Sequence, residues 1–364
     1  MATQSTAENS TRAWIDIDLG ALLRNGETLA RHARVPLVPM VKADAYGLGA
    51  VPIARALERL DPFGFGVATV DEGRELRAAG IRRRIFVFTP LLPAELAGAR
   101  DAGLTPALGS VAAVEAWGAG GGGAWHLAID TGMSRAGVRW DAAGSLGDAL
   151  RRHPPEGAFT HFHSAETDIA ATTLQERRFR DAVAALPAAP ALLHAENSAG
   201  IARPFGAAGS MWSLVRPGVF LYGVGTGPHA AFQPEPVVAM RARLVDVRDV
   251  RAGESVSYGA SWIAQRPSRV ATLAVGYADG YRRSLGNRGT ALVGGSRARV
   301  VGTVTMDMTM VDVTTAPCEV GDAVTLIGAD GGEAITVEAV AAAADLSPYE
   351  ILTGLRQRLA RRYA

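Results

Sequence analysis

The sequence lacks several features that mark whole classes of protein. Cys318 is the only cysteine among 364 residues, which excludes an intramolecular disulfide and favours a reducing, cytoplasmic setting. No apolar run approaches the roughly 20 residues of a membrane span. The 37 basic residues balance 36 acidic ones, so no global field favours nucleic acid or an anionic membrane. Residues 1–11 are polar without an apolar core, and we expect a loose tail rather than a signal peptide.

The alternation of apolar and helical segments predicts an α/β fold for the larger part of the chain. Eight short apolar runs are separated by alanine-rich stretches with charged faces, a pattern that favours a parallel sheet covered by helices. Eight such units favour a (β/α)₈ barrel over residues 12–235, although an open doubly wound sheet has the same pattern. The runs are 35–41, 63–68, 85–89, 105–108, 125–130, 157–163, 191–195 and 213–221.

The texture changes after about residue 235, where β-rich segments with Gly-Gly and Gly-Asp turns predominate. We expect a second, mostly β domain over residues 236–364, joined by a linker at Gln233–Pro236 and closed by a helix over 336–344. Its expected strands are 237–249, 269–275, 290–293, 298–304, 309–313 and 323–327. Residues 14–18 also have the pattern of a strand, but the sequence does not identify its partner.

A lysine stands at the end of the first apolar run. A buried lysine is costly unless it is paired or chemically used. One use is a Schiff base, since burial lowers the amine pKa and makes the nitrogen a nucleophile. The alternative is a strand-end lysine that extends its amine to water, and for Lys42 considered alone this alternative is favoured.

Unusual polar residues stand at the carboxyl ends of five of the expected barrel strands. The carboxyl ends of barrel strands meet on the face that carries the active site. Each residue has a structural alternative, such as Ser198 as a helix cap, Gly218 as a turn glycine or His161 as a core histidine, but five coincidences on one face disfavour these alternatives. The segments are Lys42, Asp130–Arg135, His161 with His163, Asn197–Ser198 and Arg216–Gly218.

This combination points to pyridoxal phosphate. The lysine suits the aldehyde, and backbone N–H groups around Asn197–Ser198 and Gly218–Val219 suit the phosphate. Arg216 suits the ring nitrogen, where a permanently charged donor would leave that nitrogen unprotonated. Such a ring supports brief proton exchange at an α-carbon rather than transamination.

Several motifs together resemble the alanine racemase family of fold-type III pyridoxal-phosphate enzymes. These are Val-Lys-Ala-Asp-Ala-Tyr-Gly (41–47), Asp-Thr-Gly-Met-Ser-Arg (130–135), Thr-His-Phe (160–162), Asn-Ser (197–198), Arg-Pro-Gly (216–218), Val-Ser-Tyr-Gly (256–259), Gly-Tyr-Ala-Asp-Gly-Tyr (276–281), Met-Asp (306–307) and Pro-Tyr-Glu (348–350). The resemblance implies Lys42 and Tyr258 as catalytic bases. It implies cofactor contacts for Lys42, Tyr46, His161, Asn197, Ser198, Arg216, Gly218, Val219 and Tyr349, and substrate contacts for Arg135, Met306 and Tyr277.

The resemblance also implies a reaction and an assembly. The reaction is interconversion of L- and D-alanine, supplying D-alanine for peptidoglycan, with Lys42 acting on the D-substrate and Tyr258 on the L-substrate. The assembly is a homodimer whose β domain covers the partner's barrel mouth, so that Tyr258 and Met306 act in trans. We expect no metal, nucleic-acid or membrane partner. The alternatives are a broad-specificity or serine racemase on the same scaffold and a non-catalytic pyridoxal-phosphate carrier, which the β domain disfavours.

One departure from the family pattern concerns the arginine that would bind the substrate carboxylate. The family usually has a carbamylated lysine two residues before the Asp-Thr-Gly-Met aspartate, and this chain has Ala128 there. No carbamate can form on alanine. His126, Ala128 and Asp130 share a strand face, so we expect a water, an anion or His126 itself beside Arg135.

Overall fold

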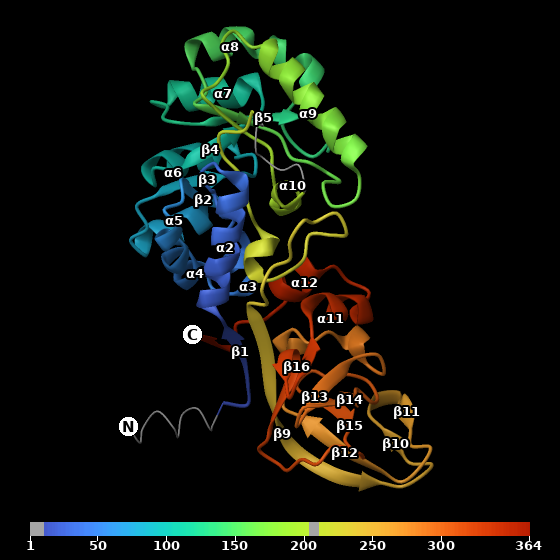
Figure 1. Ribbon diagram of the computed structural model, residues 1–364. Coiled ribbons are helices and arrows are strands. Elements are labelled where there is room, and N and C mark those ends of the chain that lie inside the picture. The colour runs from blue at the N-terminus through green and yellow to red at the C-terminus, as the bar shows by residue number, and fades with distance from the viewer. Residues whose placement is uncertain (1–10, 204–210) are drawn as a thin grey trace. The chain divides into compact units, whose positions relative to one another are not determined.

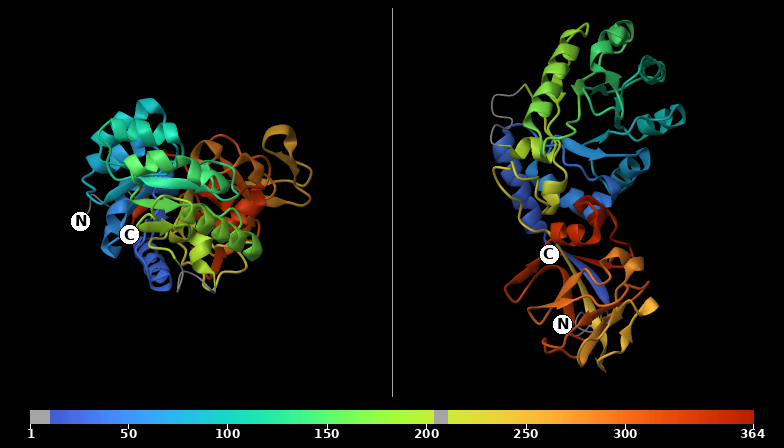
Figure 2. Two further views of the ribbon diagram at one scale, coloured as in Figure 1. Left: turned by 90° about the horizontal axis from the view of Figure 1, so that it is seen from above. Right: turned by 90° about the vertical axis from the view of Figure 1, so that its right-hand side faces the viewer.

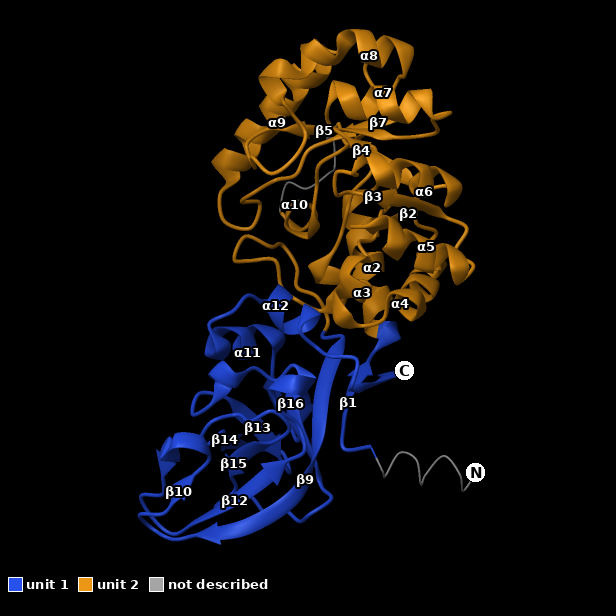
Figure 3. Cartoon of the chain, turned by 180° about the vertical axis from the view of Figure 1, so that it is seen from behind, with its two compact units in different colours: residues 1–20, 236–364 blue, residues 21–235 orange. Residues whose placement is uncertain are grey.

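The computed structural model describes residues 11–203 and 211–364, and the chain divides into two compact units (Figure 3). The barrel unit is Ala21–Glu235, and the β unit is Met1–Gly20 together with Pro236–Ala364. All of the expected tail over residues 1–11 except Thr11 lies outside the described residues.

The N-terminal strand belongs to the β unit, which places the first domain boundary at residue 20 instead of the expected residue 12. This strand, β1 (Ala13–Ile17), pairs antiparallel with β9 (Val238–Val250) and parallel with β18 (Ala360–Tyr363). Ile15 and Ile17 are fully buried there. Sequence pattern could not place this strand because its partners lie more than 200 residues away.

Six regular parallel strands form most of the barrel (Figure 1). They neighbour one another in chain order, as successive βα units require. Most of their residues are buried on both faces, which accounts for the nearly continuous apolar runs in the sequence. The strands are β2 (Gly64–Val67), β3 (Arg84–Val87), β4 (Thr105–Leu108), β5 (His126–Asp130), β7 (Gly157–Phe159) and β8 (Leu192–His194), with β6 (Val138–Arg139) beside β5.

Two less regular segments, 36–41 and 213–217, complete the ring. The Val38 N–H donates to the Val215 carbonyl at 2.8 Å, and the Val41 N–H donates to the Gly66 carbonyl at 2.8 Å. On the other side the Ser213 N–H donates to the Leu193 carbonyl at 2.7 Å. Both segments contain prolines, which lack the N–H that a continuous ladder needs. The prediction of an eight-segment α/β barrel is therefore confirmed, with six of the eight segments formed as regular strands.

Helices follow the strands and lie on the outer side of the barrel (Figure 2). Several begin at caps that the sequence encodes. Thr69 and Glu72 form a reciprocal capping box at one helix start, and the Asp168 carboxylate accepts from the Ala171 N–H at 2.9 Å at another. No described helix combines the length and apolar character that a bilayer crossing requires. The helices are α2 (Leu19–Ala33), α4 (Ala50–Leu57), α5 (Val70–Ala78), α6 (Leu96–Asp101), α7 (Val111–Ala119), α8 (Gly147–Arg152), α9 (Ile169–Ala184) and α10 (Ser198–Ala202).

The β unit is built around its longest strand, β9. Residues 238, 240, 242 and 244 of β9 are buried in strict alternation, as expected of a strand with one face on a core. The other strands are β10 (Ser255–Val256), β11 (Trp262–Ile263), β12 (Ser268–Leu273), β13 (Thr290–Val293), β14 (Ser296–Arg299), β15 (Thr309–Asp312), β16 (Ala323–Asp330) and β17 (Glu333–Ile335), and the helices are α11 (Val337–Ala344) and α12 (Pro348–Thr353). The strand expected over 298–304 is instead β14, the second strand of a hairpin that turns at Gly294 and Gly295.

Candidate active site

Lys42 stands where the first barrel segment ends and the backbone turns sharply. The next element, α3 (Lys42–Gly47), has four consecutive non-glycine residues, 43–46, with φ between 51° and 57°. Left-handed conformations cost about 1–2 kcal/mol per residue, and they are kept at functional sites when the surroundings fix them. Here the Glu72 carboxylate accepts from the Ala43 N–H at 2.7 Å, and the Asp44 carboxylate accepts from the Ala50 N–H at 2.7 Å.

The electrostatic surroundings of Lys42 favour a neutral amine. Burial is the main cause that lowers its pKa, and the positive charges of Arg135 and Arg216 lower it further, while Glu72 acts in the opposite direction. A lysine with a lowered pKa is a better nucleophile and proton acceptor near neutral pH. Lys42 is also the only lysine of the chain, a compositional signal that motif analysis missed.

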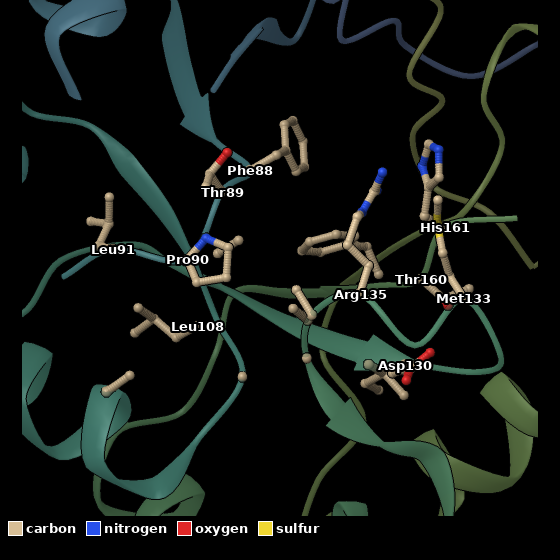
Figure 4. Close-up of a pocket in the computed structure, with 18 of the residues that line it drawn as sticks. Phe88, Thr89, Pro90, Leu91, Leu108, Asp130, Met133, Arg135, Thr160 and His161 are labelled. Carbon is tan, nitrogen blue, oxygen red and sulfur yellow. The ribbon is translucent and has the colours of Figure 1, made fainter. Parts of the chain in front are cut away.

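Lys42, Arg135 and His161 line one cavity of about 570 Å³ at the carboxyl ends of the barrel strands. Figure 4 shows the Arg135 and His161 side chains extending in the same direction, with Phe88 on the other side of Arg135. Burial, together with the charges of Arg216, Arg135 and Lys42, lowers the pKa of His161 to about 3. His161 is therefore a neutral imidazole at physiological pH.

Arg216 is buried next to this cavity, and barrel residues hold its guanidinium on several sides. It donates to the Thr160 carbonyl at 2.7 Å, to the Ala195 carbonyl at 3.1 Å and to His194 Nδ1 at 2.6 Å. Its guanidinium carbon lies 5.2 Å from the centroid of the Phe159 ring. Burial is the main cause that lowers its pKa to about 9, which still leaves it charged at neutral pH.

A cluster of hydroxyl and amide groups follows the seventh and eighth barrel segments. The Ser198 hydroxyl accepts from the Gly218 N–H at 2.8 Å and from the Phe220 N–H at 3.3 Å. Tyr46, 7% exposed, packs its ring 4.6 Å from that of Tyr222. Val219 begins the short 3₁₀ helix η4 (Val219–Tyr222).

Asn197 has a local task in the same cluster. Its side-chain oxygen accepts from the Gly200 N–H at 2.9 Å and so caps α10. The sequence offered Ser198 as a helix cap. A cap is present at this helix start, but Asn197 forms it and not Ser198.

These groups fit a ligand that carries an aldehyde, an aromatic nitrogen and an anionic end. One lysine amine, one buried arginine and a set of hydroxyl and amide groups lie within a single unit. Gly218 has no side chain that would fill the space beside the Tyr46 hydroxyl. Pyridoxal phosphate has these three chemical features in one molecule.

The remaining predicted site residues belong to the β unit and are exposed. Tyr258 in η5 (Tyr258–Ala260) is 73% exposed and Met306 is 53% exposed. The segment that precedes Met306 contacts both tyrosine segments of the β unit. The Thr303 hydroxyl donates to the Tyr258 carbonyl at 3.4 Å, and the Tyr277 N–H donates to the Thr305 carbonyl at 3.0 Å. Tyr277 and Tyr349, the latter on α12, are also exposed.

Ala128, which stands where the family usually has a carbamylated lysine, lines the same cavity as Arg135. It packs against Ala107 and Phe159, and no ion pair to Arg135 is found among residues 11–203 and 211–364. His126 does not fill the gap, since its Nδ1 lies 2.7 Å from His194 and its Nε2 faces Glu156. This leaves a water or an anion as the expected neighbour of Arg135.

Known proteins resemble the chain over nearly its whole length. Family models of the alanine racemase N-terminal and C-terminal domains match residues 17–226 and 237–363. The alanine racemase of Symbiobacterium thermophilum is 40% identical, covering 96% of this chain and 96% of its own length. That of Deinococcus radiodurans is 39% identical, covering 96% and 99%. The crystal structure of alanine racemase from Bartonella henselae with covalently bound pyridoxal phosphate has a TM-score of 0.89 and 31% identity, covering 97% of this chain and 100% of that one.

The barrel with its lysine cavity, the β unit and these matches thus define the protein as a pyridoxal-phosphate-dependent isomerase. The chain belongs to the alanine racemase family. The expected fold class, cofactor and enzyme class are confirmed by these matches.

Proposed function

We propose that the chain interconverts L- and D-alanine by two-base proton transfer, with Lys42 and Tyr258 as the bases. The observation that carries this proposal is the position of Lys42, whose pKa is lowered, in one cavity with Arg135. Inversion requires that a proton leaves one face of the α-carbon and arrives on the other, so a single base serves it poorly. Lys42 Nζ would serve the D-substrate face, and Tyr258 Oη would serve the L-substrate face.

The barrel unit supplies the groups that would hold the cofactor. Pyridoxal phosphate, when bound, supplies an electron-withdrawing ring that stabilises loss of the α-proton. Lys42 would hold its aldehyde carbon and Arg216 would donate to its ring nitrogen. The contacts proposed for the phosphate and the ring are Tyr46, His161, Asn197, Ser198, Gly218, Val219 and Tyr349.

Arg135 would orient the amino acid by its carboxylate. A guanidinium presents a planar fork of donors that matches a carboxylate, and Arg135 reaches the same cavity as Lys42. The Asp130 carboxylate supports the loop before Arg135, accepting from the Gly132 N–H at 2.9 Å and the Ser134 N–H at 3.0 Å. Met306 and Tyr277 would complete the substrate contacts.

We further propose that the active enzyme is a cytoplasmic homodimer that supplies D-alanine for peptidoglycan. Exposed apolar side chains support the dimer, because large ones such as Tyr258, Met306 and Met308 are seldom left open to water in a group. A site shared between two chains also explains why the two proposed bases lie on different units.

The test combines a racemisation assay with chemical labelling. The protein with pyridoxal phosphate should convert each alanine enantiomer into an equal mixture, measured by circular dichroism. Borohydride reduction should attach the cofactor to Lys42, and the Lys42→Ala variant should lose both the label and the activity in both directions. Since the chain has no other lysine, the N-terminal amine is the one alternative target. Racemisation by Lys42→Ala, or a label confined to the N-terminus, would overturn the proposal.

A further inference from the structure

A row of polar side chains runs through the barrel interior below Arg216. His194 Nδ1 lies 2.6 Å from Arg216 Nη1, and His194 Nε2 lies 2.7 Å from His126 Nδ1. His126 Nε2 faces a Glu156 carboxylate oxygen at 3.6 Å, and Glu156 also pairs with Arg84. Both histidines are 1% exposed, so this row is enclosed by the barrel for most of its length.

Every N–H in this row donates in the same direction, from Arg216 toward His194 and from His194 toward His126. Arg216 can only donate, so His194 Nδ1 must accept and its proton must sit on Nε2. His126 Nδ1 must then accept from His194, which places the His126 proton on Nε2, toward the Glu156 carboxylate. Burial lowers the pKa of His126 and of His194, and both rings are neutral. Arg216 therefore selects the tautomer of His194, His194 in turn selects that of His126, and the Glu156 charge at 3.6 Å favours the same arrangement.

The row connects the two ends of the barrel. Arg216 lies in the eighth barrel segment, near its carboxyl end. Glu156 immediately precedes β7 and Arg84 is the first residue of β3, so both lie at the amino end. His126 and Arg84 hold the pKa of Glu156 below its usual range. Arg216 thus sets the direction of the hydrogen bonds through His194 to His126, and the Glu156 carboxylate lies 3.6 Å from the last nitrogen of the row, where its negative charge attracts the His126 Nε2–H.

The backbone next to His126 is shaped to accept the ring. A Cβ on Gly157 would lie 2.5 Å from His126 Cε1, so only glycine leaves room for the imidazole between His194 and Glu156. Aromatic side chains enclose the row from the side, with Phe86 5.0 Å from the His126 ring and Phe159 stacked 5.1 Å from the His194 ring.

We propose that Glu156 and His126 are positioning residues that fix His194 as the acceptor of Arg216 and so hold the guanidinium in place toward the cofactor ring. The proposal rests on the role of Arg216 given under Proposed function. If Glu156 is lost, the buried His126 Nε2–H no longer faces a negative charge, so the tautomers favoured by Arg216 lose part of their stabilisation relative to those in which His194 presents its N–H to Arg216. Orientation by such supporting hydrogen bonds is well known for ligands of metal sites.

The test uses Glu156→Ala with Glu156→Gln as the conservative variant, because the amide oxygen keeps a negative partial charge facing the His126 Nε2–H. The matched control is Glu115→Ala. Glu115 likewise pairs with an arginine, Arg152, and lies 3.6 Å from a histidine, His153, but it does so away from Arg216. All variants are studied as holoenzymes.

Two measurements report on the row. Nitrogen NMR of ¹⁵N-histidine protein should show two buried neutral histidines protonated at Nε2 in the wild type and in Glu115→Ala, and a changed tautomer pattern in Glu156→Ala. The pH profile of the absorbance of the lysine-bound cofactor should shift by more than half a pH unit in Glu156→Ala. kcat should fall by roughly 10-fold with a smaller change in KM, and Glu156→Gln should recover most of both effects.

The outcomes separate this proposal from the proposed function. If Glu156→Ala changes the histidine tautomers but leaves the cofactor spectrum and kcat unchanged, the positioning role is overturned, while racemisation by the wild type still supports the function. Unchanged tautomers in Glu156→Ala overturn the chain itself. If Glu156→Ala fails to fold, Gly157→Ala takes its place, since it displaces His126 and retains the carboxylate. It should then give the same tautomer change and spectral shift, and wild-type values would overturn the proposal.

Discussion

The hydroxyl oxygen of Tyr46 lies so close to Gly218 that a Cβ atom on Gly218 would come within 2.4 Å of it. Tyr46 belongs to the left-handed turn after Lys42, and Gly218 belongs to the turn after Arg216. Two chain segments more than 170 residues apart therefore meet without a side chain between them. This contact brings a tyrosine hydroxyl to the Ser198–Gly218 cluster proposed to bind the phosphate.

We predict that Gly218→Ala weakens cofactor binding. The new methyl group displaces the Tyr46 hydroxyl, and the dissociation constant for pyridoxal phosphate should rise by roughly 10-fold or more, about 1.4 kcal/mol. Fluorescence or absorbance titration of the apoenzyme measures this constant. Gly144→Ala is the control, since the nearest atom to its Cβ is 3.7 Å away. Equal affinities of wild type and Gly218→Ala would contradict the proposed phosphate site.

Tyr258→Phe should slow racemisation in both directions but affect α-proton exchange of the two enantiomers unequally. The variant lacks the phenolic oxygen proposed as the base for the L-substrate, and racemisation should fall by roughly 10²–10⁴-fold. Exchange of the α-proton with deuterated solvent should persist more readily from D-alanine, on which Lys42 acts. Tyr363→Phe, another partly exposed tyrosine of the β unit, should behave as the wild type. Equal loss of exchange from both enantiomers would rule out this division of labour.

Mixtures of two inactive variants test whether the site is shared between chains. If Tyr258 acts on the partner's barrel, a heterodimer of a Lys42→Ala chain and a Tyr258→Phe chain has one site with both wild-type bases. Exchange of subunits between folded dimers should then restore part of the wild-type activity. With random exchange about half of the dimers are heterodimers with one intact site of two, so the mixture reaches at most about a quarter of the wild-type activity. Subunit exchange is verified by mass spectrometry with differently tagged chains. Proven heterodimers without activity would favour a site built within one chain.

The enzyme should be indifferent to bicarbonate. Ala128 cannot form a carbamate, and a chloride ion or an ordered water should lie beside Arg135 on the cavity wall. Activity in degassed buffer should equal activity with added bicarbonate, and Ala128→Lys should be tolerated and gain a bicarbonate dependence. A crystal structure provides the decisive check. An apolar side chain packed against the Arg135 guanidinium, with no ion or water there, would refute the prediction.

Glu196 should make the protein less stable as the pH rises from about 4.5 to 7. It is 2% exposed, and burial raises its pKa to about 7 from an ordinary value of 4.5, against the opposing charge of Arg203. Between these pH values the folded chain binds more protons than the unfolded chain, so the free energy of unfolding falls with rising pH, by roughly 3 kcal/mol at most.

The Glu196→Gln variant should flatten this pH dependence. Its melting temperature, measured on the holoenzyme at pH 5 and pH 7.5 and at fixed protein concentration, should change less than that of the wild type. Glu115→Gln is the control, because ion pairing lowers the pKa of Glu115 and its removal should not affect this pH range in the same way. Identical slopes for Glu196→Gln and wild type would show that Glu196 does not titrate there.

Local pattern in the sequence was sufficient for the barrel. Apolar runs that bury both faces of a strand, capping residues such as Thr69 and Asp168, and breaks at glycine and proline are all properties of neighbouring residues. The same reasoning placed Lys42, His161 and Arg216 at strand ends, and the carboxyl ends of parallel strands necessarily meet on one face. Motif resemblance added the β-unit residues, whose roles no local pattern could supply.

Only the tertiary structure decided which distant residues touch. The partners of β1 lie more than 200 residues away, and Glu72, which holds the turn after Lys42, is an ordinary helix-start glutamate in the sequence. His126 and His194 are isolated histidines until the ring of strands brings their nitrogens to 2.7 Å. Sequence determines the period and chemistry of each element because these depend on local neighbours. Hydrogen-bond partners within the barrel depend on closure of the ring, which no single segment encodes.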